Sequence, residues 1–421
     1  MGQCFHSSKT PRSQRISALT LDVEVIRSFN NYRPTFTFLP QLRHLLWSIW
    51  SQEMFPYLQA FLYGSKVITL DICIDDPPTN THDGTFALSV FSSLPRLCPT
   101  IEYLDLMPDT PIASVAASDL VCQLKHLRKF HSNSLLTATA LTHLAGLCNL
   151  QRIWLLNIVP LDMSIDYLAE MRLEHPFASL RELVVDEWNV ASCIALVKPL
   201  FMTCPLKSLE LCFAISPPLP QFHLLLSILC SARWTASLKT LRLETTSELQ
   251  DAPDSSLLPM ADITPLFAMK NMEVLVVLLH CPYDLDDDFM KNASLSWPNL
   301  HRLDLRDLCN SDADISRVSM DGVLSLVQGC PGLTSIGVTV NMRTENLGPR
   351  PSCYPNVTEF LVGESTLDDS VLVFEYLWNT FPNLDSQLAW NVEENPQRTL
   401  WLEVDNLWQR KNGEMLYITL E

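Results

Sequence analysis

The densest group of side chains that could do chemistry is the acidic run Asp284, Asp286, Asp287 and Asp288. Several carboxylate oxygens at short spacing can hold a hard cation such as Ca²⁺. The run lacks the alternating Asp-x-Asp-x-Asp-Gly order and the closing Glu of a calcium-binding loop. We therefore predict a solvated acidic loop at this position and no metal site.

The histidines and cysteines give no stronger signal for catalysis or metal binding. The 10 histidines are dispersed, and His44, His126 and His301 fall at equivalent or adjacent positions of a repeated motif. The 13 cysteines include no Cys-x-x-Cys pair, which argues against a zinc site and against a disulfide framework. Phosphate-loop, dinucleotide-binding, nucleophile-elbow and His-Glu-x-x-His motifs are missing from the sequence. We therefore predict that the chain is not an enzyme and has no cofactor.

Composition and charge narrow the class of partner. The chain has 421 residues, of which 47% are hydrophobic and 18% charged, so we expect a folded protein. Its net charge of −18 would repel nucleic acid and anionic lipid. No apolar run approaches the ~20 residues that cross a bilayer, and Met1–Arg15 lacks the apolar stretch of a signal peptide. These features predict an intracellular protein, cytoplasmic or nuclear, with neither nucleic acid nor membrane as partner.

A strand-start pattern, roughly Pro-x-Leu-x-x-Leu-x-Leu, recurs along the chain and supplies the elements that must position any site. Clear copies are Pro99–Leu106 and Pro298–Leu305. The first apolar anchors of the successive copies are Leu42, Val67, Ile101, Leu127, Leu150, Leu180, Leu206, Leu238, Met272, Leu300, Leu333, Val357 and Leu384. Their spacing averages about 28 residues, which falls in the leucine-rich-repeat range of ~20 to 29 residues.

Between the strand starts, the apolar period changes from two to about 3.6, which predicts a helix in each repeat. The helical patterns are Ala138–Leu147, Ile165–Met171, Ser192–Met202, Phe222–Ser231, Met320–Gln328 and Asp369–Asn379. The fold class is therefore predicted to be α/β, a leucine-rich-repeat solenoid with a parallel β-ribbon on the concave face and helices on the convex face.

Three segments are expected along the chain. Residues 1–34 should be an irregular N-terminal segment, and residues 35–390 the repeat solenoid. Residues 391–421 should form a C-terminal cap. There, Thr399–Val404 and Met415–Leu420 read as strands joined at Asn412-Gly413, which favours a β-hairpin.

Each strand start has three apolar anchors. The residue between the second and third anchors, and the residue after the third, are expected to face the concave side. They are Asp105, His131, Trp154, Leu156, Val184, Asp186, Glu210, Arg242, Glu244, Val276, Asp304 and Arg306. Trp154 and Leu156 would form an apolar spot flanked by Asp186 and Glu210, as in a binding hot spot. The alternative is that a neighbouring loop covers Trp154. The residues predicted to bind a protein are Asp105, Trp154, Leu156, Asp186, Glu210, Arg242, Glu244, Asp304 and Arg306.

Three segments also carry a resemblance to a known family. FLPQLRHLLW at Phe38–Trp47, LPRLCPTIEYLDL at Leu94–Leu106 and LKHLRKFHSNSLLT at Leu124–Thr137 resemble fungal F-box proteins with C-terminal leucine-rich repeats. The resemblance implies a repeat domain that captures a substrate for ubiquitination, while an N-terminal F-box docks to the Skp adaptor of a cullin-RING ligase. Residues 1–34 do not carry the Leu-Pro-x-Glu-Leu opening of an F-box.

Two functions from different classes of interaction protein follow, with one enzyme alternative. The first is a non-catalytic module that recognises the substrate of an F-box-type ubiquitin ligase, with the Skp adaptor as a second partner if an F-box lies upstream. The second is a stand-alone leucine-rich-repeat adaptor or inhibitor with no role in ubiquitination. A hydrolytic enzyme would need a polar triad, and the sequence shows none.

Overall fold

The computed structural model describes most of the chain as two compact units. It describes residues 14–17, 28, 39–49, 55–74, 85–108, 111–133, 136–156, 175–200, 204–246, 257–306, 316–348, 352–363, 365–385 and 397–412. Unit 1 is Met1–Val184 and unit 2 is Val185–Glu421, so the division falls inside strand β7 (Glu182–Trp188). Each unit is considered by itself below.

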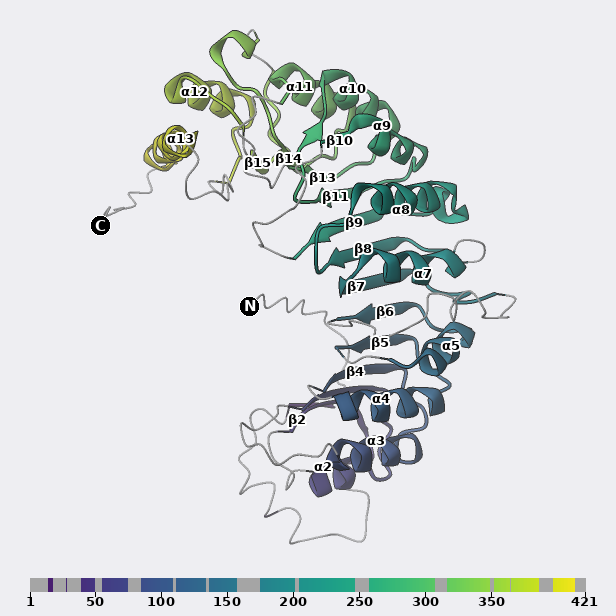
Figure 1. Cartoon of the computed structure of the whole chain (residues 1–421). Coiled ribbons are helices and arrows are strands. Elements are labelled where there is room, and N and C mark those ends of the chain that lie inside the picture. Colours follow the sequence, from purple (N-terminus) through teal and green to yellow (C-terminus); the bar gives the residue numbers. More distant parts are fainter. Residues whose placement is uncertain are drawn as a thin grey trace. The chain divides into compact units, whose positions relative to one another are not determined.

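Unit 1 alternates strands and helices. Its strands are β1 (Gln14–Ser17), β2 (Leu42–Ile49), β3 (Thr69–Ile74), β4 (Tyr103–Pro108), β5 (Lys129–Ser132) and β6 (Arg152–Leu155). They pair in parallel in chain order. Its helices are α2 (Phe55–Leu62), α3 (Thr85–Leu97), α4 (Pro111–Gln123) and α5 (Ala138–Gly146), which lie along one side of the strands (Figure 1).

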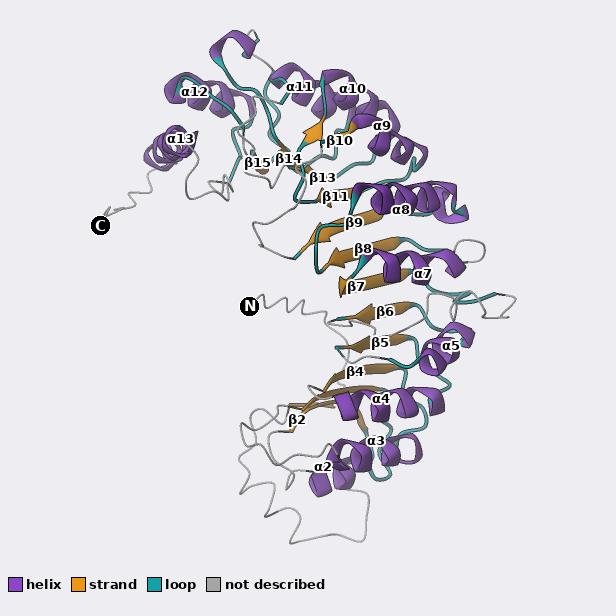
Figure 2. Cartoon of the chain, in the orientation of Figure 1, coloured by secondary structure: helices purple, strands orange, loops and turns teal. Residues whose placement is uncertain are grey.

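Unit 2 repeats the same arrangement. The main parallel sheet contains β8 (Ser208–Phe213), β9 (Thr240–Thr245), β11 (Val274–Leu278), β13 (Arg302–Leu305), β14 (Ser335–Val338) and β15 (Glu359–Leu361) in that order. The α-helices are α7 (Val190–Leu200), α8 (Leu219–Ser231), α9 (Met260–Ile263), α10 (Asp287–Ser296), α11 (Met320–Gly329), α12 (Ser370–Thr380) and α13 (Gln397–Asn412). Short 3₁₀ helices η3 (Arg233–Ala236), η4 (Thr264–Ala268) and η5 (Thr344–Asn346) and a small sheet of β10 (Leu258–Pro259) and β12 (Tyr283–Asp284) complete it (Figure 2).

The predicted anchors explain why these strands and helices form. All thirteen are buried, and none is more than 4% exposed. The two residues after an anchor donate their N–H groups to one carbonyl of the preceding repeat, as Arg128 and Lys129 do to Glu102 and as Glu273 and Val274 do to Lys239. Each strand therefore starts where the previous repeat offers a free acceptor, and the repeats stack in register. The fold is an α/β leucine-rich-repeat solenoid, as predicted from the period.

The helices begin where the sequence provides a side-chain acceptor. The hydroxyl of Ser319 accepts the N–H of Asp321 at the start of α11. Thr137, Asp286 and Asp369 cap α5, α10 and α12 in the same way. The predicted helices at Ser192–Met202, Phe222–Ser231 and Asp369–Asn379 correspond to α7, α8 and α12. The predicted helix at Ile165–Met171 lies outside the described residues.

Two predictions about the ends of the chain were wrong. The N-terminal segment is not wholly irregular, because β1 pairs in parallel with β2. Thr399–Val404 is not a hairpin strand but part of helix α13. Trp401, Val404 and Trp408 are buried there at spacings of three and four residues, which is the period of a helix face. The second predicted hairpin strand, Met415–Leu420, lies outside the described residues.

No helix among the described residues combines the length and the apolar character needed to cross a bilayer.

Candidate protein-binding face

The sheet of each unit has one face covered by helices, and we call the opposite face the open face (Figure 2). Burial alternates along β5, β6 and β8, so every second side chain points to this face. In unit 1, the strand register aligns Asp71 with Asp105, Asp105 with His131, and His131 with Trp154. One residue from each of four neighbouring strands thus forms a continuous row across the open face.

Direct contacts join three members of that row. His131 Nδ1 lies 2.8 Å from Asp105 Oδ2, so the carboxylate fixes the orientation of the imidazole. The imidazole stacks on the indole of Trp154, with ring centroids 4.5 Å apart and ring planes at 22°. Trp154 is still 39% exposed, so it is not covered by a loop. The indole of Trp154 is therefore supported on one side by His131 and accessible from solvent, and its role as a binding spot together with Leu156 stays a prediction.

The neighbouring rows in unit 1 differ in character. Towards the starts of the strands, the Lys129 ammonium lies 4.8 Å from the centre of the Tyr103 ring, and Arg152 pairs with Glu182. Towards the strand ends lies Leu156, which is partly exposed and whose N–H donates to Ser132. The exposed indole therefore separates a charged row from a partly apolar one.

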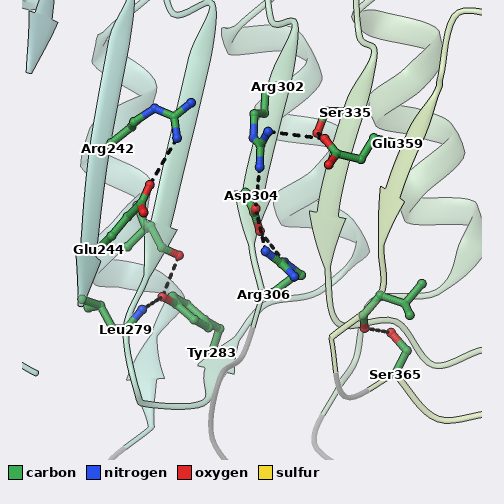
Figure 3. Close-up of polar contacts among 12 residues, drawn as sticks. Arg242, Glu244, Leu279, Tyr283, Arg302, Asp304, Arg306, Ser335, Glu359 and Ser365 are labelled. Atoms are coloured by element: carbon green, nitrogen blue, oxygen red, sulfur yellow. Dashed lines mark hydrogen bonds and ion pairs between the residues drawn. The ribbon is translucent and has the colours of Figure 1, made fainter. Parts of the chain in front are cut away.

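In unit 2, the open face of β7 to β9 carries a mixed charged cluster. Arg242 lies 3.3 Å from Glu244 (Figure 3). It also lies 4.0 Å from Glu210. Burial raises the pKa of Asp186, although a Glu187 backbone N–H and the Cys212 thiol both hydrogen bond to its carboxylate. Burial, reinforced by the surrounding carboxylates, raises the pKa of Cys212 to about 12, so this thiol stays protonated and can donate to Asp186.

The predicted cluster of Trp154, Leu156, Asp186 and Glu210 combines residues of both units. Trp154 and Leu156 belong to unit 1, while Asp186 and Glu210 belong to unit 2. Within the units, the structure brings Asp105, His131 and Trp154 together, and it brings Glu210, Arg242 and Glu244 together.

Further along unit 2, three residues that were expected to face the concave side have little or no exposed surface. Val276 and Asp304 are both 0% exposed, and the Arg306 side chain is only 14% exposed. Arg306 donates from Nε and Nη2 to Asp304 at 2.8 and 3.0 Å, and Arg302 donates to Asp304 at 3.3 Å. Figure 3 shows both guanidinium groups directed at this carboxylate. A buried charge needs such partners, so Asp304 is held for structural reasons.

The same network includes residues that the sequence analysis missed. Arg302 also lies 3.3 Å from Glu359, and Ser335 donates to Glu359. Gly337 sits opposite Asp304 in the register, and a Cβ there would lie 2.6 Å from Asp304 Cγ. The sequence pattern Arg302-x-Asp304-x-Arg306 could have indicated this network, because alternate residues of a strand point to the same face.

The acidic run of Asp284 to Asp288 is not the solvated loop that we predicted. Asp286 caps α10 by accepting the Phe289 N–H at 2.9 Å. Asp287 accepts the Ser319 N–H and hydroxyl, both at 2.7 Å, and so joins two successive repeats. Asp284 pairs with Arg317. Within the described part of the chain, no group of three or more His, Cys, Asp or Glu side chains is placed to hold a metal ion.

No protein-family model and no curated protein matches this sequence. Similar solved structures include Rad7 in a complex with Elc1 from yeast, at 16% identity and a TM-score of 0.45 over 88% of this chain and 82% of that chain. An internalin from Listeria monocytogenes has 13% identity and a TM-score of 0.39 over 80% and 83% of the two chains. A leucine-rich-repeat protein from Leptospira interrogans has 14% identity and a TM-score of 0.39 over 87% of each chain. At these values, the likenesses transfer no function to this chain.

Proposed function

We propose that this chain is a non-catalytic protein-interaction module that binds a protein on the open face of its sheet. The observation that carries the proposal is Trp154, a large aromatic side chain that is 39% exposed although it stacks on its register neighbour His131, which Asp105 in turn orients. Fixed aromatic side chains are the commonest anchors of protein interfaces because they bury a large area at a low entropic cost.

We further propose that the captured protein is a substrate for ubiquitination, and that the chain acts in the cytoplasm or nucleus. The support for this step is the sequence resemblance to F-box proteins with leucine-rich repeats. Under this proposal, the Skp adaptor of a cullin-RING ligase is a second partner. The competing proposal is a stand-alone adaptor or inhibitor, which would use the same open face without any adaptor.

The binding proposal is tested by affinity purification with two matched variants. Trp154→Ala should weaken capture of the partner by about 2 kcal/mol or more, since it removes the proposed hot spot. Tyr63→Ala, which removes a 66% exposed aromatic side chain just after α2, should leave capture unchanged. Equal recovery of the same partner by wild type and Trp154→Ala would remove the open face of unit 1 as the binding site.

The ubiquitin proposal needs a separate measurement. The full chain, and the same chain with any upstream reading frame, would be co-expressed with the Skp adaptor and purified. Recovery of a stoichiometric complex supports the ligase assignment. If the Skp adaptor binds neither form while the protein captured on the open face is retained, this chain is instead a stand-alone leucine-rich-repeat adaptor or inhibitor.

A further inference from the structure

In unit 1, the residues around the starts of the last strands form a positively charged edge, although the protein as a whole is negatively charged. We define the basic edge as Lys125, Arg128, Lys129, Arg152 and Arg181, which lie at or just before the starts of β5, β6 and β7. Two carboxylates, Glu102 and Glu182, accompany these five cations, so the local net charge is +3 in a chain whose net charge is −18.

The repeat brings these side chains together. The backbone N–H groups of Arg128 and Lys129 donate to the carbonyl of Glu102. In the same way, Gln151 and Arg152 donate to Arg128, and Arg181 and Glu182 donate to Gln151. The three strand starts that carry the basic edge are therefore adjacent and about 4.8 Å apart, with Lys125, Arg128 and Lys129 at β5, Arg152 at β6 and Arg181 at β7. Three strand starts in a row span about 10 Å, the length of three to four residues of extended peptide.

The cations are only partly neutralised. Arg128 lies 3.2 Å from Glu102, and Arg152 pairs with Glu182. Lys129 lies over the Tyr103 ring and has no carboxylate partner among the described residues. Lys125 and Arg181 are exposed, and neither forms an ion pair with any residue that the structure describes. Asp105, one row further along the strands, is already engaged by His131.

The exposed indole of Trp154 lies on the same face as Arg152, two residues along the same strand and so about 7 Å away. We propose that the basic edge and Trp154 together bind an acidic peptide segment of the partner, with its carboxylates or phosphates on the cations and an apolar side chain on the indole. This inference rests on the proposed binding function of the open face and specifies the chemistry of the bound segment. The charge of the whole chain disfavours nucleic acid at the same edge.

The test selects peptides without assuming a partner. Random 12-residue peptides displayed on phage would be selected against the immobilised full chain and its variants. The double variant Lys125→Glu/Arg181→Glu reverses two exposed cations of the edge. The control Lys198→Glu/Lys291→Glu makes the same charge change at exposed positions on helices α7 and α10 of unit 2, away from the strand starts.

The expected peptides are rich in Asp and Glu around an apolar or aromatic residue. Their synthetic forms should bind wild type and the control equally in fluorescence anisotropy, bind Lys125→Glu/Arg181→Glu at least tenfold more weakly, and lose affinity as salt rises. Phosphoserine versions of the same peptides decide between the two sources of charge: tighter binding than the Glu versions indicates a phosphorylated segment, and equal or weaker binding an acidic one.

Three results would overturn the inference. The first is selection of neutral or basic peptides. The second is binding of acidic peptides to Lys125→Glu/Arg181→Glu with the same affinity as to wild type. The third is binding of a single-stranded RNA oligonucleotide to this edge more tightly than the peptides. Peptides that depend on Trp154 but are not acidic would contradict only the stated chemistry. Peptides whose binding survives Trp154→Ala would contradict the proposed function itself.

Discussion

The open face differs between β4 to β6 of unit 1 and β11 to β15 of unit 2, although the same positions of the repeat form both. In β6, buried and exposed side chains alternate, and Trp154 is accessible. In β14, all four residues are buried, and Val276 on β11 and Asp304 on β13 have no exposed surface. The first region leaves side chains of its open face exposed, whereas the second buries the side chains at the same positions. A position in the repeat therefore fixes the direction of a side chain but not its accessibility.

The difference has a chemical basis in the strands. β6 reads Arg-Ile-Trp-Leu, with Arg152 and Trp154 exposed in alternate positions, whereas β11 reads Val-Leu-Val-Val-Leu. A strand that is apolar on both faces is stable only when both faces are covered. The charges that remain in β13 pair with one another, because an unpaired charge would be costly there.

The largest expected effect comes from removing the buried carboxylate. Asp304→Ala leaves the guanidinium groups of Arg302 and Arg306 without their shared partner and should cost about 3–5 kcal/mol of unfolding free energy. Glu244→Ala, which removes a partner of Arg242 on the part-exposed face, should cost less than about 1 kcal/mol. Urea unfolding followed by circular dichroism measures both values. Equal losses would mean that the two regions do not differ as described.

A smaller effect should follow from filling the space beside the carboxylate. Gly337→Ala would place a Cβ 2.6 Å from Asp304 Cγ and 3.2 Å from Arg306 Nε, so the network must shift. We expect a loss of about 1–3 kcal/mol in the same urea measurement.

The matched control for that substitution is Gly146→Ala in unit 1. No atom lies within 4 Å of the added Cβ, and Gly146 is the last residue of α5. This change should be neutral or stabilise by up to about 1 kcal/mol. If Gly337→Ala is as harmless as its control, Asp304 is not tightly confined.

The smallest effect concerns Asp186, whose raised pKa distinguishes the open face of β7 to β9 from ordinary surface. A folded-state pKa above the unfolded value favours folding at low pH, and this stability is lost as pH rises through the folded pKa. At pH 7, the charged form therefore opposes folding. Asp186→Asn should raise the melting temperature at pH 7, and the gain should vanish below about pH 4.

Asp368 provides the opposite case for comparison. Its hydrogen bond with the Thr344 side chain lowers the pKa of its carboxyl, which favours folding above the unfolded pKa. Asp368→Asn should lower the melting temperature at pH 7, with a loss that shrinks as pH falls through the lowered pKa. Melting curves at pH 7, 5 and 3.5 for both variants check the two signs, and two shifts in the same direction would contradict the assignment.

The sequence predicted the repeat because one apolar residue per repeat must be buried whatever surrounds it, and Leu42 through Leu384 all are. The same geometry predicted the direction of the Trp154 side chain but left open whether a neighbouring loop covers it. It did not predict the burial of Asp304, because the repeat pattern gives only the direction of that side chain, although the apolar run Val274–Leu278 indicated a covered face. Helix α13 was missed because Thr, Trp and Val were read as strand formers, although Trp401, Val404 and Trp408 follow a helical period. The pairing of β1 depends on β2 and leaves no periodic signal in four residues.

Side-chain accessibility measured by hydroxyl-radical footprinting and mass spectrometry tests the contrast between the two regions most directly. Trp154 should be oxidised far faster than the buried Trp188, Trp234 and Trp297. Val276 and Leu361, at open-face positions of β11 and β15, should be protected like core residues. Oxidation of Val276 and Leu361 at the rate of exposed side chains, or protection of Trp154, would contradict the division into an exposed face and a covered one.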